Sequence, residues 1–168
     1  GAETLAYVYS HYFLGRRATA LARIDLLNKI SQNFDVTVYT HADCKDILPT
    51  AIYGGKIDYY DTMPTVFQHS KLNLNITLKT IQTGIPLRAW DILGCGGFLL
   101  TNFQQELCDF FIPGEDFVYY ESPADAIEKA AYFLSHDRER QEITHNAFEK
   151  IAASHTFHHR VQSMFEII

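Results

Sequence analysis

The chain has 168 residues, 47% of them apolar, so it is long enough to bury a core without disulfides or a structural metal. Its net charge of −6 is not offset by a basic run, which disfavours nucleic acid or an anionic membrane as a partner. No segment approaches the roughly 20 apolar residues of a membrane span, and the three cysteines lack zinc-site spacing. We therefore expect one globular domain with reduced thiols, located in the cytoplasm and without a transmembrane segment.

The first half of the chain alternates helical and extended patterns. Apolar residues at helical spacing between positions 20 and 30 predict a helix in the N-terminal segment 1–34. The glycines of Tyr53-Gly54-Gly55 predict a turn. Three strands and one helix are then expected, with strands at 36–39, 56–60 and 71–77 and a helix at 61–69 that begins near Pro64.

The most informative stretch runs from Thr83 to Gly97 and leads into an apolar strand at 98–101. Pro86 suits the first position of a helix, and the apolar residues at positions 87, 90 and 93 fall on one side of it. Glycines at positions 94, 96 and 97 end this helix before the strand. Such a helix followed by a buried strand is typical of an α/β sheet.

The last part of the chain completes this pattern. A short helical segment at 104–110 and a strand at 117–120 come first, and three helices follow. Ser122 can cap the first of these helices, whose expected buried residues are Ile127, Ala130, Ala131 and Leu134; Ile143, Ala147 and Ile151 mark the second. Thr156 can cap the third, with an apolar stripe of Val161, Met164, Phe165 and Ile168.

Strands separated by helices predict a Rossmann-like, doubly wound parallel sheet. We interpret residues 1–168 as one such domain, with a helical segment at 1–34, a sheet core at 35–121 and C-terminal helices at 122–168. Because the chain begins with Gly1 rather than Met, we expect it to be a domain excised from a longer protein.

Ligands of such sheets bind beyond the carboxyl ends of the strands, which directs attention to the loop after Thr77. This loop combines hydroxyl, lysine and glycine groups with the N-terminus of the helix at Pro86, where a diphosphate is favoured. Neither the dinucleotide fingerprint nor the Walker loop is present, which disfavours a nicotinamide enzyme or an NTPase. The candidate ligand contacts are Thr77, Lys79, Thr80, Thr83, Gly84, Arg88, Asp91, Gly96 and Gly97.

The order of these motifs resembles the group 1 glycosyltransferases. The resemblance rests on the strand at 72–77, the stretch from Gly84 to Gly97, the run Pro113-Gly114-Glu115-Asp116 and the closing His155-Thr156-Phe157 with Arg160. The nearest branch is similar to the CgeB-like, spore-maturation-type proteins of bacteria. The resemblance implies the GT-B architecture, in which two Rossmann-like domains face each other and the carboxyl-terminal one binds the nucleotide of the sugar donor.

The resemblance also implies roles for individual residues. Asp91 matches the second of two acidic donor contacts and would accept hydrogen bonds from ribose hydroxyls, whereas Thr83 stands where the family has the first acid. Arg16, Arg17 and Lys79 are candidates for holding the pyrophosphate. The donor would be a nucleoside diphosphate sugar, with no obligatory cofactor or metal. The acceptor would be a glycan, protein or lipid, and its binding site and the general base would come from the missing N-terminal domain.

Other interpretations remain open. Arg88 and Asp91 lie three residues apart and suit an exposed ion pair, and the glycines near position 96 suit a helix end. His155, His158 and His159 lack an acid or cysteine at partner spacing, so we assign no metal. The neutral Thr83 favours a non-catalytic GT-B-like interaction module as the alternative function. An epimerase or a phosphatase-like enzyme is a further possibility, although no paired Asp motif is present.

Overall fold

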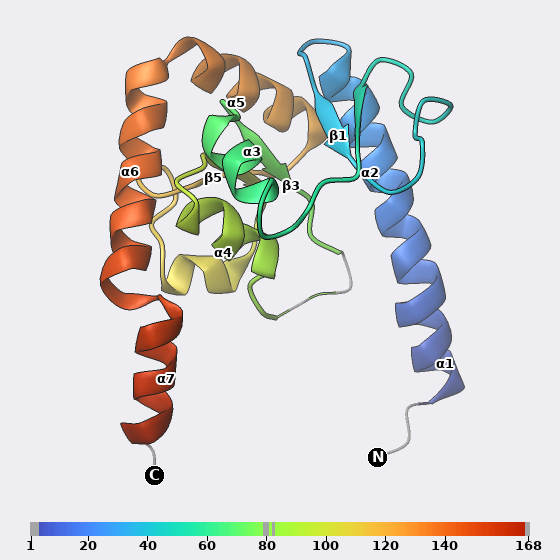
Figure 1. Cartoon of the computed structure of the whole chain (residues 1–168). Helices are drawn as coiled ribbons and strands as arrows, with labels where there is room; N and C mark the ends of the chain where they lie inside the picture. Colours follow the sequence, from blue (N-terminus) through green and yellow to red (C-terminus); the bar gives the residue numbers. More distant parts are fainter. Residues whose placement is uncertain (1–3, 79–80, 82, 167–168) are drawn as a thin grey trace.

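The computed structural model describes residues 4–78, 81 and 83–166. Helices surround a small parallel sheet, and the helices at the two ends of the chain extend beyond this body on the same side (Figure 1). Near the N-terminus, α1 (Leu5–Val8), the π-helix η1 (Tyr9–Gly15) and α2 (Arg16–Ser31) follow one another directly, and α2 contains the helix expected between positions 20 and 30.

The remaining elements alternate strands and helices. In chain order they are β1 (Thr37–Tyr39), β2 (Ile52–Gly55), α3 (Met63–His69), β3 (Asn73–Asn75), α4 (Leu87–Gly94), β4 (Leu99–Asn102), the 3-10 helix η2 (Gln105–Asp109), β5 (Val118–Tyr120), α5 (Pro123–Ser135), α6 (Asp137–Ser154) and α7 (Phe157–Glu166). None of the helices in the described part of the chain combines the length and the apolar character that a membrane span requires.

The strand pairs in the described part of the chain are all parallel, and they form two sheets. β1 pairs with β2, and β3, β4 and β5 form a second sheet in that order. Parallel neighbours need crossover connections, and α4 supplies the one between β3 and β4. The expected α/β fold with a parallel Rossmann-like sheet is confirmed.

The core lies on both faces of the three-stranded sheet. Leu100 packs with helices α2 and α5, whereas Leu99, the preceding residue of β4, packs with α3, α4 and α6. Both leucines are buried because successive side chains of a strand point to opposite faces, and helices cover each face. This double burial gives the sheet a fixed position between two helical layers.

The expected turn at Tyr53-Gly54-Gly55 and strand at 56–60 are wrong. The strand β2 contains these glycines, and the segment after it is a loop. A Cβ atom built on Gly54 would lie 2.6 Å from the ring of Tyr39 and 2.9 Å from Thr37. The residue at position 54 is therefore a glycine because the side chains of β1 leave no room for a Cβ atom there, and not because the chain turns.

The expected helices form, but several expected faces differ. Pro86 is the N-cap of α4 rather than its first residue, and Leu87 is exposed while Ala89, Ile92 and Leu93 are buried. In α5 the buried residues are Ala126, Ala130 and Phe133, and Ala131 is exposed. Ser122 caps α5 as expected, since its hydroxyl accepts a hydrogen bond from the amide of Asp125.

Helix α7 forms with Thr156 at its start, where the hydroxyl accepts a 3.4 Å hydrogen bond from the amide of His159. Its expected apolar stripe is not buried: Val161, Met164 and Phe165 are all exposed. Ile168 lies outside the described residues. Helical periodicity identified this element correctly, but the body of the domain does not cover its apolar face.

Candidate functional site

Strands β3, β4 and β5 end side by side at Asn75, Asn102 and Tyr120, and these ends together with the loops that follow them form the carboxyl edge of the sheet. It contains a buried polar network. The amide of Asn75 donates to the hydroxyls of Thr77 and Thr101 over 3.1 and 2.9 Å, and the Tyr120 hydroxyl donates to the Asn75 carbonyl. Burial raises the pKa of Tyr120, so its phenol remains a neutral donor.

Thr77 belongs to this network rather than to an open ligand surface. Its side chain is buried, and its backbone N–H donates to the side-chain oxygen of Asn102 over 2.7 Å. Thr77 therefore joins the end of β3 to the end of β4. Lys79 and Thr80, two further expected contacts, lie outside the described residues.

Beyond Thr77, the loop returns to α4 past an acidic side chain. Thr83 is exposed, and Gly84 adopts a positive φ of 99°. The N–H of Gly84, which the sequence suggested as a phosphate donor, instead donates to the carboxylate of Glu106 in η2. The Glu106 carboxylate therefore already accepts the hydrogen bond that the Gly84 N–H could have given to a phosphate.

Asp91 is held by a tyrosine from a distant loop. The hydroxyl of Tyr59 lies 2.9 Å from each carboxylate oxygen of Asp91, and this hydrogen bond is the main cause of the raised pKa of Tyr59. Asp58 shapes the tyrosine loop, because its carboxylate accepts hydrogen bonds from the amides of Tyr60 and Asp61, which lower the pKa of Asp58. The carboxylate of Asp91 keeps unused lone pairs for a second donor.

Arg88 does not form the ion pair with Asp91 that the sequence left open as an alternative to ligand contact. Its guanidinium lies 2.7 Å from the sulfur of Met63 and 5.5 Å from the ring centre of Phe67, both in α3. Among the ion pairs of the described residues, none joins Arg88 to Asp91. The interpretation of this spacing as an exposed salt bridge is therefore wrong.

The two glycines after α4 have a structural explanation. Gly97 donates to the carbonyl of Ile92 and Gly96 to that of Leu93, with Gly96 at a φ of 71°, which is the Schellman arrangement of a helix end. A Cβ atom on Gly97 would lie 2.8 Å from the backbone oxygen of Phe67. These contacts favour the helix-end interpretation over ligand binding.

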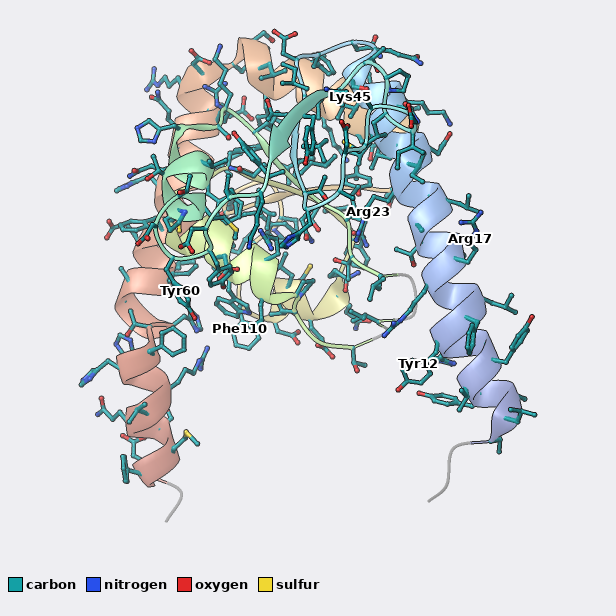
Figure 2. All side chains as sticks on the ribbon, turned by 45° about the vertical axis from the view of Figure 1, so that its right-hand side comes forward. Tyr12, Arg17, Arg23, Lys45, Tyr60 and Phe110 are labelled. Carbon is teal, nitrogen blue, oxygen red and sulfur yellow. The ribbon has the colours of Figure 1, made fainter. Side chains whose placement is uncertain are left out.

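The expected phosphate residues Arg16 and Arg17 lie on the projecting N-terminal helix, where Arg17 is exposed (Figure 2). The guanidinium of Arg16 lies 5.6 Å from the ring centre of Tyr12. A different arginine reaches the carboxyl edge. Arg23 donates over 2.9 Å to the carbonyl of Ile76, immediately after β3. Its spacing of two helical turns from Arg16 is the sequence signal that could have found it.

Three side chains at or near the edge were thus missed: Arg23, Tyr59 and Glu106. The last two come from a loop and a short 3-10 helix that have no distinctive sequence pattern. Within the described part of the chain, no group of three His, Cys, Asp or Glu side chains is arranged to hold a metal ion. His155 and His159 contact Arg160 and Thr156 respectively.

The parallel sheet and its polar carboxyl edge define the chain as an α/β domain of the Rossmann-like class. Residues 16–166 match the family model described as Glycosyl transferase-like, so the chain belongs to that family, and its role is in glycosyl transfer. No curated protein sequence matches the chain.

Proposed function

We propose that this domain binds a nucleoside diphosphate sugar at the carboxyl edge, as the donor-binding half of a CgeB-like glycosyltransferase. The observation that carries the proposal is Asp91, whose carboxylate is fixed by Tyr59 and remains able to accept hydrogen bonds from a ribose diol. The neighbouring Tyr60 ring is 83% exposed and is available to stack on a base. A carboxylate beside an exposed aromatic ring suits a nucleoside.

The diphosphate would lie between Arg23 and the N-terminus of α4. Among the described residues, the Ile76 carbonyl is the acceptor that Arg23 uses, which leaves its guanidinium with further N–H donors for phosphate oxygens. The dipole of α4 and the backbone N–H groups of its first turn favour the same anion. In the proposed reaction these groups stabilise the negative charge that develops on the leaving diphosphate.

We assign the binding site for the acceptor and the general base to a second domain that faces this one. No side chain at the described carboxyl edge combines a perturbed pKa with a free position for proton abstraction. We expect this domain alone to bind nucleotide and to transfer no sugar.

The test is a calorimetric titration of the domain with UDP, GDP, ADP, CMP and dTDP. One nucleotide should bind selectively, and Asp91→Ala should weaken it at least about tenfold through the loss of a charged hydrogen bond. Glu128→Ala, which removes an exposed carboxylate on α5, is the matched control and should bind normally. Equal affinity of the wild type and Asp91→Ala would contradict the proposed ribose contact.

A non-catalytic interaction module is the second candidate, and the hydrogen bond between Glu106 and Gly84 favours it, because this carboxylate stands where a phosphate would bind. Glu106→Ala separates the two functions. In a donor site the variant frees the Gly84 N–H and should bind nucleoside diphosphates more tightly than the wild type. A module without a donor site should bind none of them in either form.

A further inference from the structure

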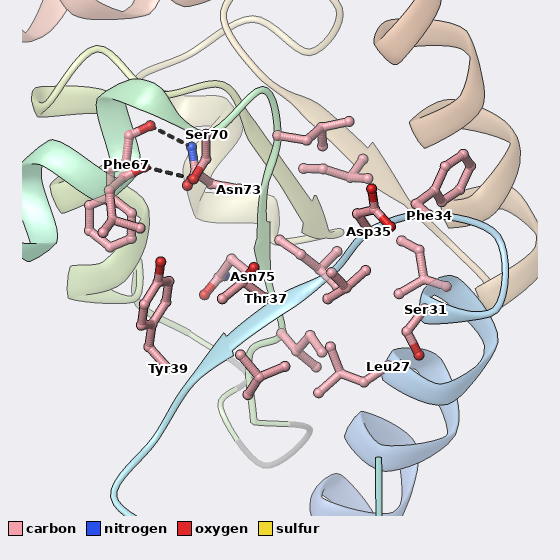
Figure 3. A pocket seen from close by; sticks show the side chains of 18 of the residues that line it. Leu27, Ser31, Phe34, Asp35, Thr37, Tyr39, Phe67, Ser70, Asn73 and Asn75 are labelled. Atoms are coloured by element: carbon pink, nitrogen blue, oxygen red, sulfur yellow. Dashed lines mark hydrogen bonds between the residues drawn. The ribbon is translucent and has the colours of Figure 1, made fainter. Parts of the chain in front are cut away.

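A cavity separates the two sheets. It has a volume of about 1370 Å³ and runs along the whole length of β1 and β3, with α2 and α3 at its sides (Figure 3). Residues of β1 and β3 line it, whereas the described residues of β2 contribute none. β2 therefore occupies the other edge of β1, and β4 occupies the other edge of β3. The unpaired edges of β1 and β3 both border the same space.

The side chains around this cavity are only partly covered. Leu72, Leu74 and Ile76 on one side of β3 are half-buried, although the polar Asn73 and Asn75 on its opposite side are buried. Val36 and Val38 are half-buried as well. Aliphatic side chains of strands in an α/β sheet are normally covered on both faces. This pattern indicates that an apolar element is missing between β1 and β3.

The N-terminal segment has the properties of that element. From Thr4 to Gly15 it contains no Asp, Glu, Lys or Arg, and residues 5–10 read Leu-Ala-Tyr-Val-Tyr-Ser. Such a continuous run of aromatic and aliphatic residues suits a strand that is buried on both faces. In its helical form the segment buries nothing: α1 and η1 have no buried residue, and Leu5 is 85% exposed.

The topology allows the segment to enter the cavity. α2 passes along it from Arg23, at the carboxyl edge, to Ser31, and then leads into β1. A strand that precedes α2 would end at the carboxyl edge and run parallel to β1, so that strand, α2 and β1 would form a βαβ unit. The connection is also long enough. Arg16, at the start of α2, lies seven residues, or about 10 Å along the helix, before Arg23. Residues 11–15 can span roughly 17 Å when extended, so they can join a strand at 5–10 to α2.

We propose that the cavity between β1 and β3 is a strand-acceptor site and that residues 5–10 leave the projecting helix and fill it as a parallel β-strand. Inserted there, the segment pairs with both free edges and joins the two sheets into one of six strands. It also covers the half-buried aliphatic side chains and removes two unpaired strand edges, which are templates for aggregation. This inference does not depend on the proposed function.

Hydrogen exchange of the wild-type chain, read by mass spectrometry, tests the proposal directly. Amides of residues 5–10 in a central strand should exchange within about tenfold of those of β3 and β4. Exchange of residues 5–10 as fast as that of the exposed helix α7 would overturn the proposal. Protection that disappears on dilution, together with a dimer, would also overturn it, because a second copy would then supply the strand.

A pair of variants gives the second measurement. Tyr9 and Tyr12 are both exposed in the helical form, but only Tyr9 lies within the inserted segment. Tyr9→Lys should lower the melting temperature by about 6 °C or more, because it places a charge in the cavity, whereas Tyr12→Lys should shift it by less than about 2 °C. Equal, small shifts would contradict insertion. If Tyr9→Lys does not fold, the exchange of the wild type still decides.

Discussion

Apolar side chains are buried in the body of the domain but exposed at its two projecting ends. In the body, Leu99, Leu100 and Phe117 are fully buried between helical layers. In α7, Phe157 is 93% exposed, and α1 and η1 bury no residue at all. Figure 1 shows both ends extending away from the body. Helices α4 and α5 in the body and α7 outside it are all amphipathic, so the presence of a partner surface is what separates α7 from them.

This difference has a consequence for stability. Helices that bury no side chain gain little from tertiary packing and open at low free energy, whereas core elements open only with the whole domain. Substitutions in the body should therefore change global unfolding, and matched substitutions in α7, or in side chains that serve only the helical form of α1, should not. The following variants test that separation from the largest expected effect to the smallest.

A phenylalanine pair gives the largest contrast. Phe117→Ala removes a fully buried ring beside β5 and should lower the free energy of unfolding by about 3–5 kcal/mol. Phe157→Ala removes an exposed ring from α7 and should change it by less than about 0.5 kcal/mol. Urea denaturation monitored by circular dichroism measures both. A large loss in Phe157→Ala would mean that α7 packs against the body.

A glycine pair tests the close packing after α4. In Gly97→Ala the new Cβ would lie 2.8 Å from the Phe67 carbonyl oxygen and 3.1 Å from that of Ile92, so the variant should lose about 1–3 kcal/mol. In Gly94→Ala the nearest atom is a methyl of Ile151 at 3.8 Å, an ordinary contact, and helix propensity should add about 0.5 kcal/mol. Similar urea midpoints for the two variants would contradict the steric role of Gly97.

The glycines also show which parts of the fold the sequence can predict. Helices and strands with strong periodicity, such as α5 and β4, form where expected, because local pattern and core packing agree. β2 was missed because Gly54 is required by the ring of Tyr39, which lies 15 residues earlier in the chain. Turn propensity depends only on residues adjacent in the sequence, so it cannot reveal a contact between Gly54 and a residue as distant as Tyr39.

The candidate site shows the same limit. Asp91 and the loop after Thr77 could be found from motif order and strand ends, but their partners could not. Tyr59 lies 32 residues from Asp91, and Glu106 lies 22 residues from Gly84. Only the assembled sheet brings these pairs together, and no periodicity connects them.

A pair of helix caps compares the two regions directly. The Ser122 hydroxyl accepts a 3.2 Å hydrogen bond from the amide of Asp125 at the start of α5, and Thr4 caps α1 in the same way through Tyr7. Ser122→Ala should lower the free energy of unfolding by about 1 kcal/mol, since α5 unfolds with the core. Thr4→Ala should have no measurable effect on urea unfolding, because α1 opens locally. Equal losses would show that α1 is part of the cooperative unit.

The smallest effect concerns the junction between the body and α7. His155 contacts the rings of Trp90 and Phe110, with centroid distances of 5.2 and 5.4 Å, and its Nδ1 is 2.6 Å from the guanidinium of Arg160. Burial, followed by the charge of Arg160, lowers the pKa of His155 from its ordinary value of 6.5. The imidazole is therefore neutral at pH 7 and accepts the hydrogen bond from Arg160.

The sign of the pH dependence follows from this lowered pKa. Because the unfolded state binds the proton more tightly, the contribution of His155 is fully present above about pH 6.5 and is lost as the pH falls through the folded-state pKa. Fluorescence of Trp90, the sole tryptophan, should report a loosened junction on acidification from pH 7 to 5. His155→Gln should remove this change, whereas His145→Gln, on the exposed side of α6, should retain it. An unchanged acid response in His155→Gln would assign that response to another titratable group.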